Sequence, residues 1–318
     1  MTRKETRFTN ILRSRGVGLI LSFIGVWMTW RCLPSITPAG WLGTFPELSC
    51  VANISVIMAT ALVMIGINRT FTLLRTLSVF FAAYFIFITC ATPGVAGVLG
   101  PSSLLAGIVI WCMGILFTLY HQRRSDRRIF LIFCLLSAGT MVDWRFLFYV
   151  PVFFVGMVQM RILRFKKIIA AIIGLITPPW IVFGLDLIPI THFRLPHIFF
   201  TPPTLLLETP GSWPFLCTVL FTMVTGFVFG STSLLRILGF NARARAYNGF
   251  LAMLGIYTGV LAIINFTALP TYVTLLNACV AMQVGHFFRA TASRRGYILI
   301  LTLIAAYSGL YAWAASSI

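Results

Sequence analysis

Long apolar runs, separated by short basic or Pro/Gly-rich segments, occupy most of the chain. Runs of about 20 apolar residues are typical of helices that cross a bilayer. Eleven such helices are predicted, at residues 17–30, 48–67, 76–90, 102–120, 129–142, 146–160, 168–190, 214–238, 249–269, 271–288 and 296–316. No polar stretch between them is long enough for a soluble domain. The pattern therefore predicts an all-α polytopic transmembrane helical bundle that forms a single integral membrane domain, 1–318.

The runs at 129–142 and 146–160 predict a short hairpin around the triplet Asp143-Trp144-Arg145. Basic clusters stand before the first arm and after the second, so we expect the chain to leave and return on one side of the membrane. Helical arms of 14 and 15 residues would reach about 21 to 23 Å, against roughly 30 Å of hydrocarbon. The hairpin tip is therefore expected beneath the outer interface.

The net charge of +18 is explained by where the Lys and Arg residues lie along the chain. Of the 24 Lys and Arg residues, 21 fall in segments predicted on one side, and an excess of these residues marks the cytoplasmic side. The basic turns have no interleaved aromatic residues on which bases could stack, so no nucleic-acid partner is expected. We expect a multi-pass protein of a bacterial inner (cytoplasmic) membrane, with a cytoplasmic N-terminus and a periplasmic C-terminus.

Acidic residues are scarce, and four of the six fall on or near the predicted outer face. Together with nearby basic residues they could line one outward-facing cavity that binds an anionic headgroup and moves a proton. The candidate catalytic groups are Glu47 and Asp143, and the candidate substrate-binding groups are Arg31, Arg145, Asp186, His192 and Arg194. The alternative is ordinary loop polarity, with Asp143 and Arg145 satisfying each other. His197 and Glu208 lie in the same predicted outer region.

Metal and cofactor chemistry is not indicated by any spacing in the chain. His192 and His197 lack neighbouring Cys or His residues that would complete a tetrahedral zinc site, and no phosphate-binding or nucleophile motif is present. No metal and no cofactor are therefore predicted. Cys32 and Cys50 flank the first predicted outer loop, which leaves open whether they pair in an oxidising compartment or stay free.

Three patterns within the predicted helices concern packing or a ligand path. Pro178 and Pro179 are expected to kink or break the run at 168–190, because proline lacks a backbone donor and crowds the preceding turn. The glycine pairs predict close helix contacts, at Gly226 and Gly230 and at Gly255 and Gly259. Asn277, Gln283 and His286 predict a polar seam, as a hydrogen-bonded packing contact or a proton path.

Four segments carry a resemblance to known families: 137–145, 148–151, 161–167 and 174–178. Their order resembles a polytopic inner-membrane family of Bacteroidota. The succession of short hairpin, proline, basic turn and Gly-to-Pro helix also resembles the middle of C-class (GT-C) glycosyltransferases, which use polyprenyl-phosphate sugars at the outer leaflet. The resemblance covers about 50 of the 318 residues.

The GT-C resemblance implies that an acid in the first outer loop serves as catalytic base, and Glu47 corresponds by placement. This chain departs from the pattern because Glu47 has no acidic neighbour and no extended C-terminal outer domain follows. Three function classes stay open: an enzyme acting on a lipid-linked glycan, a transporter or flippase, and a noncatalytic membrane component of an envelope assembly. The implied partners are a membrane lipid, a polyprenyl-phosphate sugar or other membrane proteins.

Overall fold

The computed structural model describes residues 14–36, 42–74, 79–122, 126–186, 212–237, 239, 241–290 and 294–317, and these residues contain helices and no strands. The longer helices are α2 (Arg15–Cys32), α3 (Pro46–Phe71), α6 (Pro101–Thr118), α7 (Asp126–Thr140), α9 (Phe165–Gly184), α11 (Trp213–Ile237), α12 (Ala242–Ile264), α13 (Leu269–Ala290) and α14 (Arg294–Ser317). Shorter elements are η1 (Leu33–Ser35), α4 (Phe80–Cys90), α5 (Pro93–Ala96), η2 (Trp144–Tyr149), α8 (Val150–Gln159) and η5 (Phe266–Ala268). Eight of the described helices are long and apolar enough to cross a membrane, which confirms the predicted all-α polytopic bundle.

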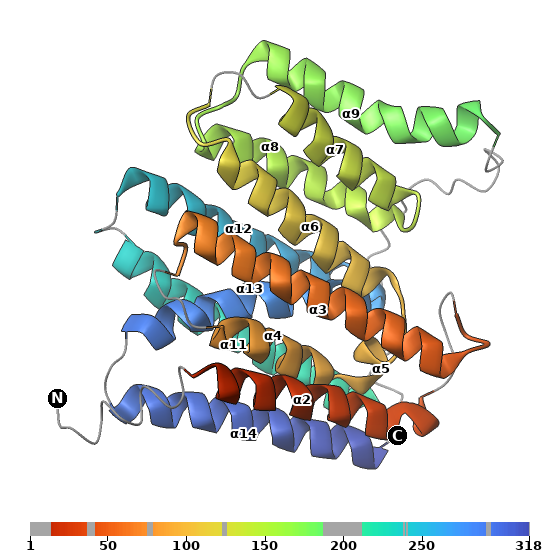
Figure 1. Cartoon of the computed structure of the whole chain (residues 1–318), viewed down its shortest axis with the longest axis vertical. Helices are drawn as coiled ribbons and strands as arrows, with labels where there is room; N and C mark the ends of the chain where they lie inside the picture. The colour runs from red at the N-terminus through yellow and green to blue at the C-terminus, as the bar shows by residue number, and fades with distance from the viewer. Residues whose placement is uncertain are drawn as a thin grey trace.

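Two helices, α4 and α13, occupy the centre of the bundle. Helix α13 packs against α4, α6, α11 and α12, while α2 and α14 lie along one edge and α7, α8 and α9 form the opposite edge (Figure 1). Every residue of α4 is buried, and 94% of the apolar segment of α13 is buried. In a bilayer, lipid can cover an all-apolar helix, so apolarity alone does not place a helix in the interior. Helix α13 has the lowest mean hydropathy of the eight candidate spans, 1.2, and its buried polar residues Thr274 and Asn277 find hydrogen-bond partners on α6 and α4.

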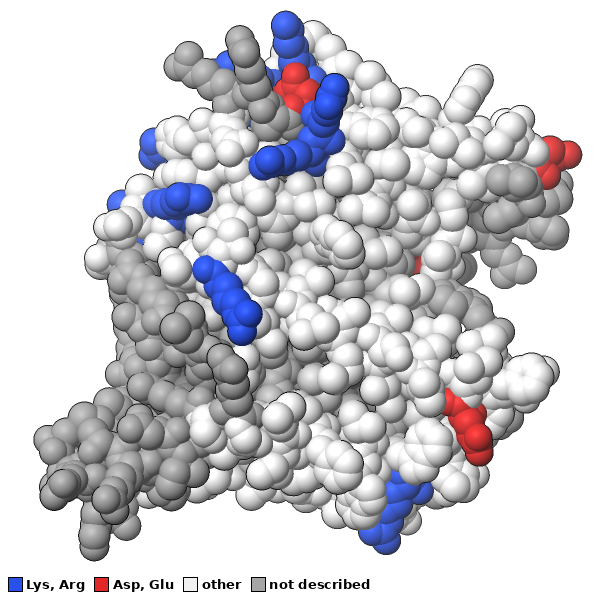
Figure 2. All heavy atoms as spheres, viewed as in Figure 1, with Lys and Arg blue, Asp and Glu red and all other residues white. Residues whose placement is uncertain are grey.

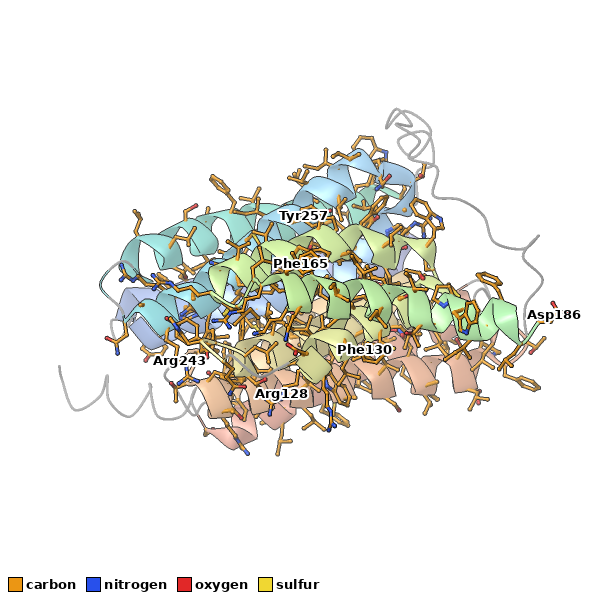
Figure 3. The ribbon with its side chains drawn as sticks, turned by 90° about the horizontal axis from the view of Figure 1, so that it is seen from above. Arg128, Phe130, Phe165, Asp186, Arg243 and Tyr257 are labelled. Carbon is orange, nitrogen blue, oxygen red and sulfur yellow. The ribbon has the colours of Figure 1, made fainter. Side chains whose placement is uncertain are left out.

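Charge separates the two ends of the bundle. Lys and Arg side chains gather at the end where α7, α9 and α12 begin, here called the basic end (Figure 2). Arg128 and Arg243 lie at this end, and Asp186 lies at the opposite end, here called the acidic end (Figure 3). Glu47 in the first turn of α3 belongs to the acidic end, together with Arg31 in the last turn of α2. The two ends therefore differ as a positive-inside topology requires.

Several helices begin earlier than the hydropathy pattern predicts. Helix α9 begins at Phe165 instead of residue 168, which places Lys166 and Lys167 inside its first turn. The Lys167 side chain is buried, and its Nζ donates to the backbone oxygen of Gln122 at 2.8 Å. Helix α12 begins at Ala242 instead of residue 249. Charged residues end an apolar run, but Lys and Arg are good helix formers, so the helices continue through them.

The predicted short hairpin is present as α7, the turn at Asp143, η2 and α8. Helices α7 and α9 both start at the basic end and have 15 and 20 residues, so they reach about 22 Å and 30 Å at 1.5 Å per residue. Helix α9 consequently extends past the end of α7 (Figure 1). The hairpin tip stops short of the level that α9 reaches, and its depth relative to the membrane interface stays a prediction.

The expected break at Pro178 and Pro179 is absent, because α9 is continuous from Phe165 to Gly184. Pro179 has no N–H to donate to the backbone oxygen of Leu175, and Ser137 of α7 donates its hydroxyl to that oxygen at 2.6 Å. Membrane helices tolerate proline where a neighbouring helix satisfies the freed carbonyl, as Ser137 does here. Of the predicted kink or break, the break therefore does not occur, and the kink stays a prediction.

Candidate functional site at the acidic end

Asp143 and Arg145 form a closed ion pair at the hairpin tip. The Asp143 carboxylate caps η2 by accepting from the Arg145 backbone N–H at 2.9 Å, and its second oxygen accepts from Arg145 Nη1 at 2.9 Å. The Asp143 side chain is 9% exposed and the Arg145 side chain 27% exposed. The pair therefore neutralises two partly buried charges within three residues of chain.

The same arginine joins the hairpin to the central helix. Arg145 Nη1 also donates to Thr271 Oγ1, in the first turn of α13, at 3.0 Å. Its guanidinium carbon lies 5.7 Å from the centre of the Trp144 ring. With a carboxylate, a hydroxyl and an aromatic ring around it, Arg145 acts as a structural connection. This geometry favours mutual satisfaction of Asp143 and Arg145 over an open cavity.

Glu47 and Arg31 lie at the same end of the bundle but on different helices, and both are exposed. Glu47 occupies the first turn of α3, where the helix dipole favours a carboxylate. Arg31 occupies the last turn of α2, with its guanidinium carbon 5.5 Å from the centre of the Trp27 ring. No ion pair joins the two residues in the described part of the chain. Glu47 is therefore a lone surface carboxylate in this part of the structure.

Asp186 follows the end of α9 with a backbone φ of 51° and an exposed side chain. Helix α9 packs on α7 at one edge of the bundle, whereas α3 packs on α4 and α6, so Asp186 and Glu47 stand apart. His192, Arg194, His197 and Glu208 lie outside the described residues. Of the predicted site residues that are described, only Asp143 and Arg145 come together. Glu47 and Asp186 stand on helices that pack at different sides of the bundle, and the shared outer cavity, which also includes His192 and Arg194, stays a prediction.

A polar contact missed from the sequence holds the connection between α4 and α6. Asn53 of α3 is buried, and its Nδ2 donates to the backbone oxygens of Val95 and Ala96 at 3.0 and 2.7 Å. Ser49 accepts from the Leu99 backbone N–H at 2.8 Å. These side chains satisfy backbone groups where the chain turns at the short helix α5. The available signal was Asn53 itself, a polar residue inside an apolar run.

The predicted polar seam on α13 is divided between two faces of the helix. Asn277 donates to Thr89 of α4 at 3.3 Å, so it makes a packing hydrogen bond. Gln283 lies six residues later, about 240° around the helix, and faces the glycines of α11 and α12. Gly226 and Gly230 pack against α13 as predicted, whereas no described residue comes within 4 Å of the Cβ that Gly259 would carry. A single seam through Asn277 and Gln283 does not form.

The cysteines flanking the first loop do not pair. Cys32 and Cys50 are both free and buried. The Cys32 sulfur lies 3.3 Å from the Tyr311 hydroxyl, which in turn donates to the Met28 backbone oxygen at 2.8 Å. Cys32 thus contributes to packing between α2 and α14.

Two apolar grooves open on the outer surface of the helix bundle. One has a volume of about 310 Å³ and lies among α3, α6 and α7. The other has a volume of about 420 Å³ and follows α12 beside Leu234 of α11. Large exposed apolar surfaces mark sites of contact with lipid, ligand or protein. In a membrane-spanning bundle, such grooves face the lipid chains.

Comparison with known proteins assigns no family to the chain. It matches no protein-family model, and no curated protein or solved structure matches it. The geometry of its own residues is therefore the evidence on function.

Proposed function

We propose that this multi-pass membrane protein binds a membrane lipid, whose chains occupy an apolar groove on the bilayer-facing surface. The observation that carries the proposal is the groove among α3, α6 and α7. Except for Thr60, its lining is apolar: Val56, Ala59, Thr60, Val63, Leu104, Gly107, Ile108, Trp111, Leu131 and Leu135. Trp111 stands at its rim with 58% of its surface exposed.

Small residues form this groove because they let α3 and α6 approach closely. A Cβ on Gly107 would lie 3.2 Å from Thr60 Oγ1, so a larger side chain there would push the helices apart. Ala59 is exposed beside this contact and leaves the groove open. The lining residues lie in the middle of α3, which spans 26 residues, so the groove is at the depth of the hydrocarbon. Lipid chains are the apolar ligands available at that depth.

Filling the groove tests the proposal. Ala59→Phe places an aromatic ring in the groove without altering a buried contact, and should lower the copurified lipid, measured by mass spectrometry of the protein in nanodiscs. Ala312→Phe is the matched control, because Ala312 is exposed on α14 outside both grooves. Equal lipid content in wild type, Ala59→Phe and Ala312→Phe would contradict the proposal.

A polyprenyl-phosphate sugar is the lipid that the GT-C resemblance implies, with transfer at the outer leaflet and Glu47 as base. The exposed position of Glu47 permits contact with an acceptor. Glu47→Gln should then abolish glycan transfer while leaving the free energy of unfolding within about 0.5 kcal/mol of wild type. Undiminished transfer by Glu47→Gln would remove this enzymatic version and leave lipid binding in place.

A noncatalytic role in a membrane assembly is the second candidate. It is favoured by the separation of Glu47 from Asp186 and by the closed Asp143–Arg145 pair, which leave the described acidic groups without a shared reaction centre. In either role we propose an inner-membrane protein whose basic end is cytoplasmic. Compartment-sensitive reporters inserted at Ser125 and after Arg161 should both report cytoplasm. If the two reporters lay on opposite sides of the membrane, the hairpin would be excluded.

A further inference from the structure

The groove along α12 lies beside a small recess that is lined by a polar side chain. The groove is lined by Leu234, Gly249, Ala252, Met253, Ile256, Tyr257 and Val260. The recess has a volume of about 60 Å³ and shares Leu234, Ala252 and Ile256 with the groove. Gln283 of α13 lines this recess. The groove and the recess are thus neighbours, and a carboxamide lines the recess.

Gln283 is 5% exposed, and its Oε1 has no hydrogen-bond partner among the residues that the structure describes. Two other lining residues carry a donor, the thiol of Cys279 and the hydroxyl of Ser231. No hydrogen bond joins Cys279 to Gln283 in the described part of the chain, and Ser231 donates to the backbone oxygen of Phe227 at 2.7 Å within α11. Ser231 therefore does not donate to Gln283. A buried carbonyl without a donor is costly, and the bilayer interior offers no water to replace it.

Glycines surround the carboxamide closely. A Cβ on Gly230 would lie 3.2 Å from both Oε1 and Nε2 of Gln283, and a Cβ on Gly255 would lie 3.2 Å from Nε2. Gly226 lets α11 approach α13, because its Cβ would lie 2.7 Å from Cγ2 of Val280. The three glycines thus leave space around the Gln283 side chain. A leucine at position 283 would fill the same space without burying a polar group.

We propose that this recess binds the hydroxyl group of a neutral lipid alcohol, with the lipid chain lying in the α12 groove. A hydroxyl both donates and accepts, so it can donate to Gln283 Oε1 and accept from Nε2. A recess of about 60 Å³ admits such a group and excludes a phosphate with its water shell. Diacylglycerols and isoprenoid alcohols share this chemistry. The inference rests on the proposed lipid binding and adds the chemical class of the lipid.

The test compares lipids that differ only at the hydroxyl. Native mass spectrometry of the full-length protein would measure the binding of dioleoylglycerol and of geranylgeraniol, each beside its methyl ether. The ether keeps the chain and the acceptor but cannot donate to Gln283 Oε1. Wild type should bind the alcohol about tenfold more tightly than the ether, which is the scale of one hydrogen bond to an otherwise unpaired buried group. The lipid showing this preference identifies the source, diacylglycerol or isoprenoid.

Two variants separate recognition of the hydroxyl from binding of the chain. Gln283→Leu should bind alcohol and ether equally, with unfolding measured to show that the variant is folded. Ile256→Trp narrows the groove and should weaken both ligands, whereas Ile263→Trp, exposed on α12 outside the groove, should weaken neither. Equal binding of alcohol and ether by wild type would overturn the hydroxyl inference and leave lipid binding intact. If wild type bound neither ligand and also carried no copurified lipid, the proposed function would fail as well.

Discussion

Ser137 of α7 and Pro179 of α9 are coupled through one backbone oxygen. The Leu175 carbonyl would normally accept from the N–H of residue 179, which proline lacks, and it accepts from Ser137 Oγ at 2.6 Å instead. Ser137 is 3% exposed, so water cannot readily replace its hydroxyl. Ser137→Ala should therefore remove the interhelical bond and leave the carbonyl unsatisfied.

The expected loss in the free energy of unfolding is about 1 to 1.7 kcal/mol. A net hydrogen bond contributes about 0.5 to 1.5 kcal/mol, and an orphaned buried acceptor adds to the cost. Measured side-chain bonds between membrane helices average about 0.6 kcal/mol and reach about 1.7 kcal/mol, which limits the upper end. Equilibrium unfolding in mixed detergent micelles would measure the loss.

A double-mutant cycle makes the reasoning refutable. Pro179→Ala restores an N–H that can donate to Leu175, so Ser137→Ala should cost about 0.5 kcal/mol or less in that background. Ser55→Ala is the matched control, because the exposed Ser55 hydroxyl donates only to Val51 of its own helix, at 2.8 Å. Its effect should stay within about 0.5 kcal/mol. If Ser137→Ala lowered the free energy of unfolding as much in the Pro179→Ala background as in wild type, Ser137 would not be replacing the hydrogen bond that Pro179 cannot make.

Two further changes probe the same part of the bundle. Gly174→Ala should destabilise by about 1 to 3 kcal/mol in the same unfolding assay, because its Cβ would lie 2.6 Å from the Phe130 backbone oxygen, whereas Gly66→Ala, with open space around it, should be neutral or stabilising. Asp143→Asn should lower the melting temperature by leaving Arg145 less compensated, and the double variant with Arg145→Gln should recover much of that loss. If Gly174→Ala changed the free energy of unfolding no more than Gly66→Ala, the close α7–α9 contact would be refuted. If the single and double variants at Asp143 and Arg145 both kept the wild-type melting temperature, residues 143–145 would be a solvated turn.

The sequence alone was sufficient for the fold class and for the order of the helices along the chain. Each spanning segment must be apolar over most of its length, and basic residues collect at helix ends on one side, so local composition carries this information. The hairpin around Asp143 followed from the same signals. The predicted positions of the helix ends were less accurate, as the starts of α9 and α12 show. Hydropathy falls at a charged residue, whereas the helix itself continues through it.

The tertiary structure decided which polar groups meet. Asp143 and Arg145 are close in sequence, so their pairing could be anticipated, but the bond from Arg145 to Thr271 joins residues 126 positions apart. The separation of Glu47 from Asp186 likewise depends on which helices pack together.

Pro179 shows the physical reason most directly. The residue predicts a lost hydrogen bond, yet whether the helix breaks depends on a donor from another helix, and Ser137 supplies it. Gln283 is the converse case, since packing between glycines leaves its carbonyl without a donor from the described part of the chain. Hydropathy is a property of each segment alone, whereas hydrogen-bond satisfaction in a dry interior depends on pairs of segments.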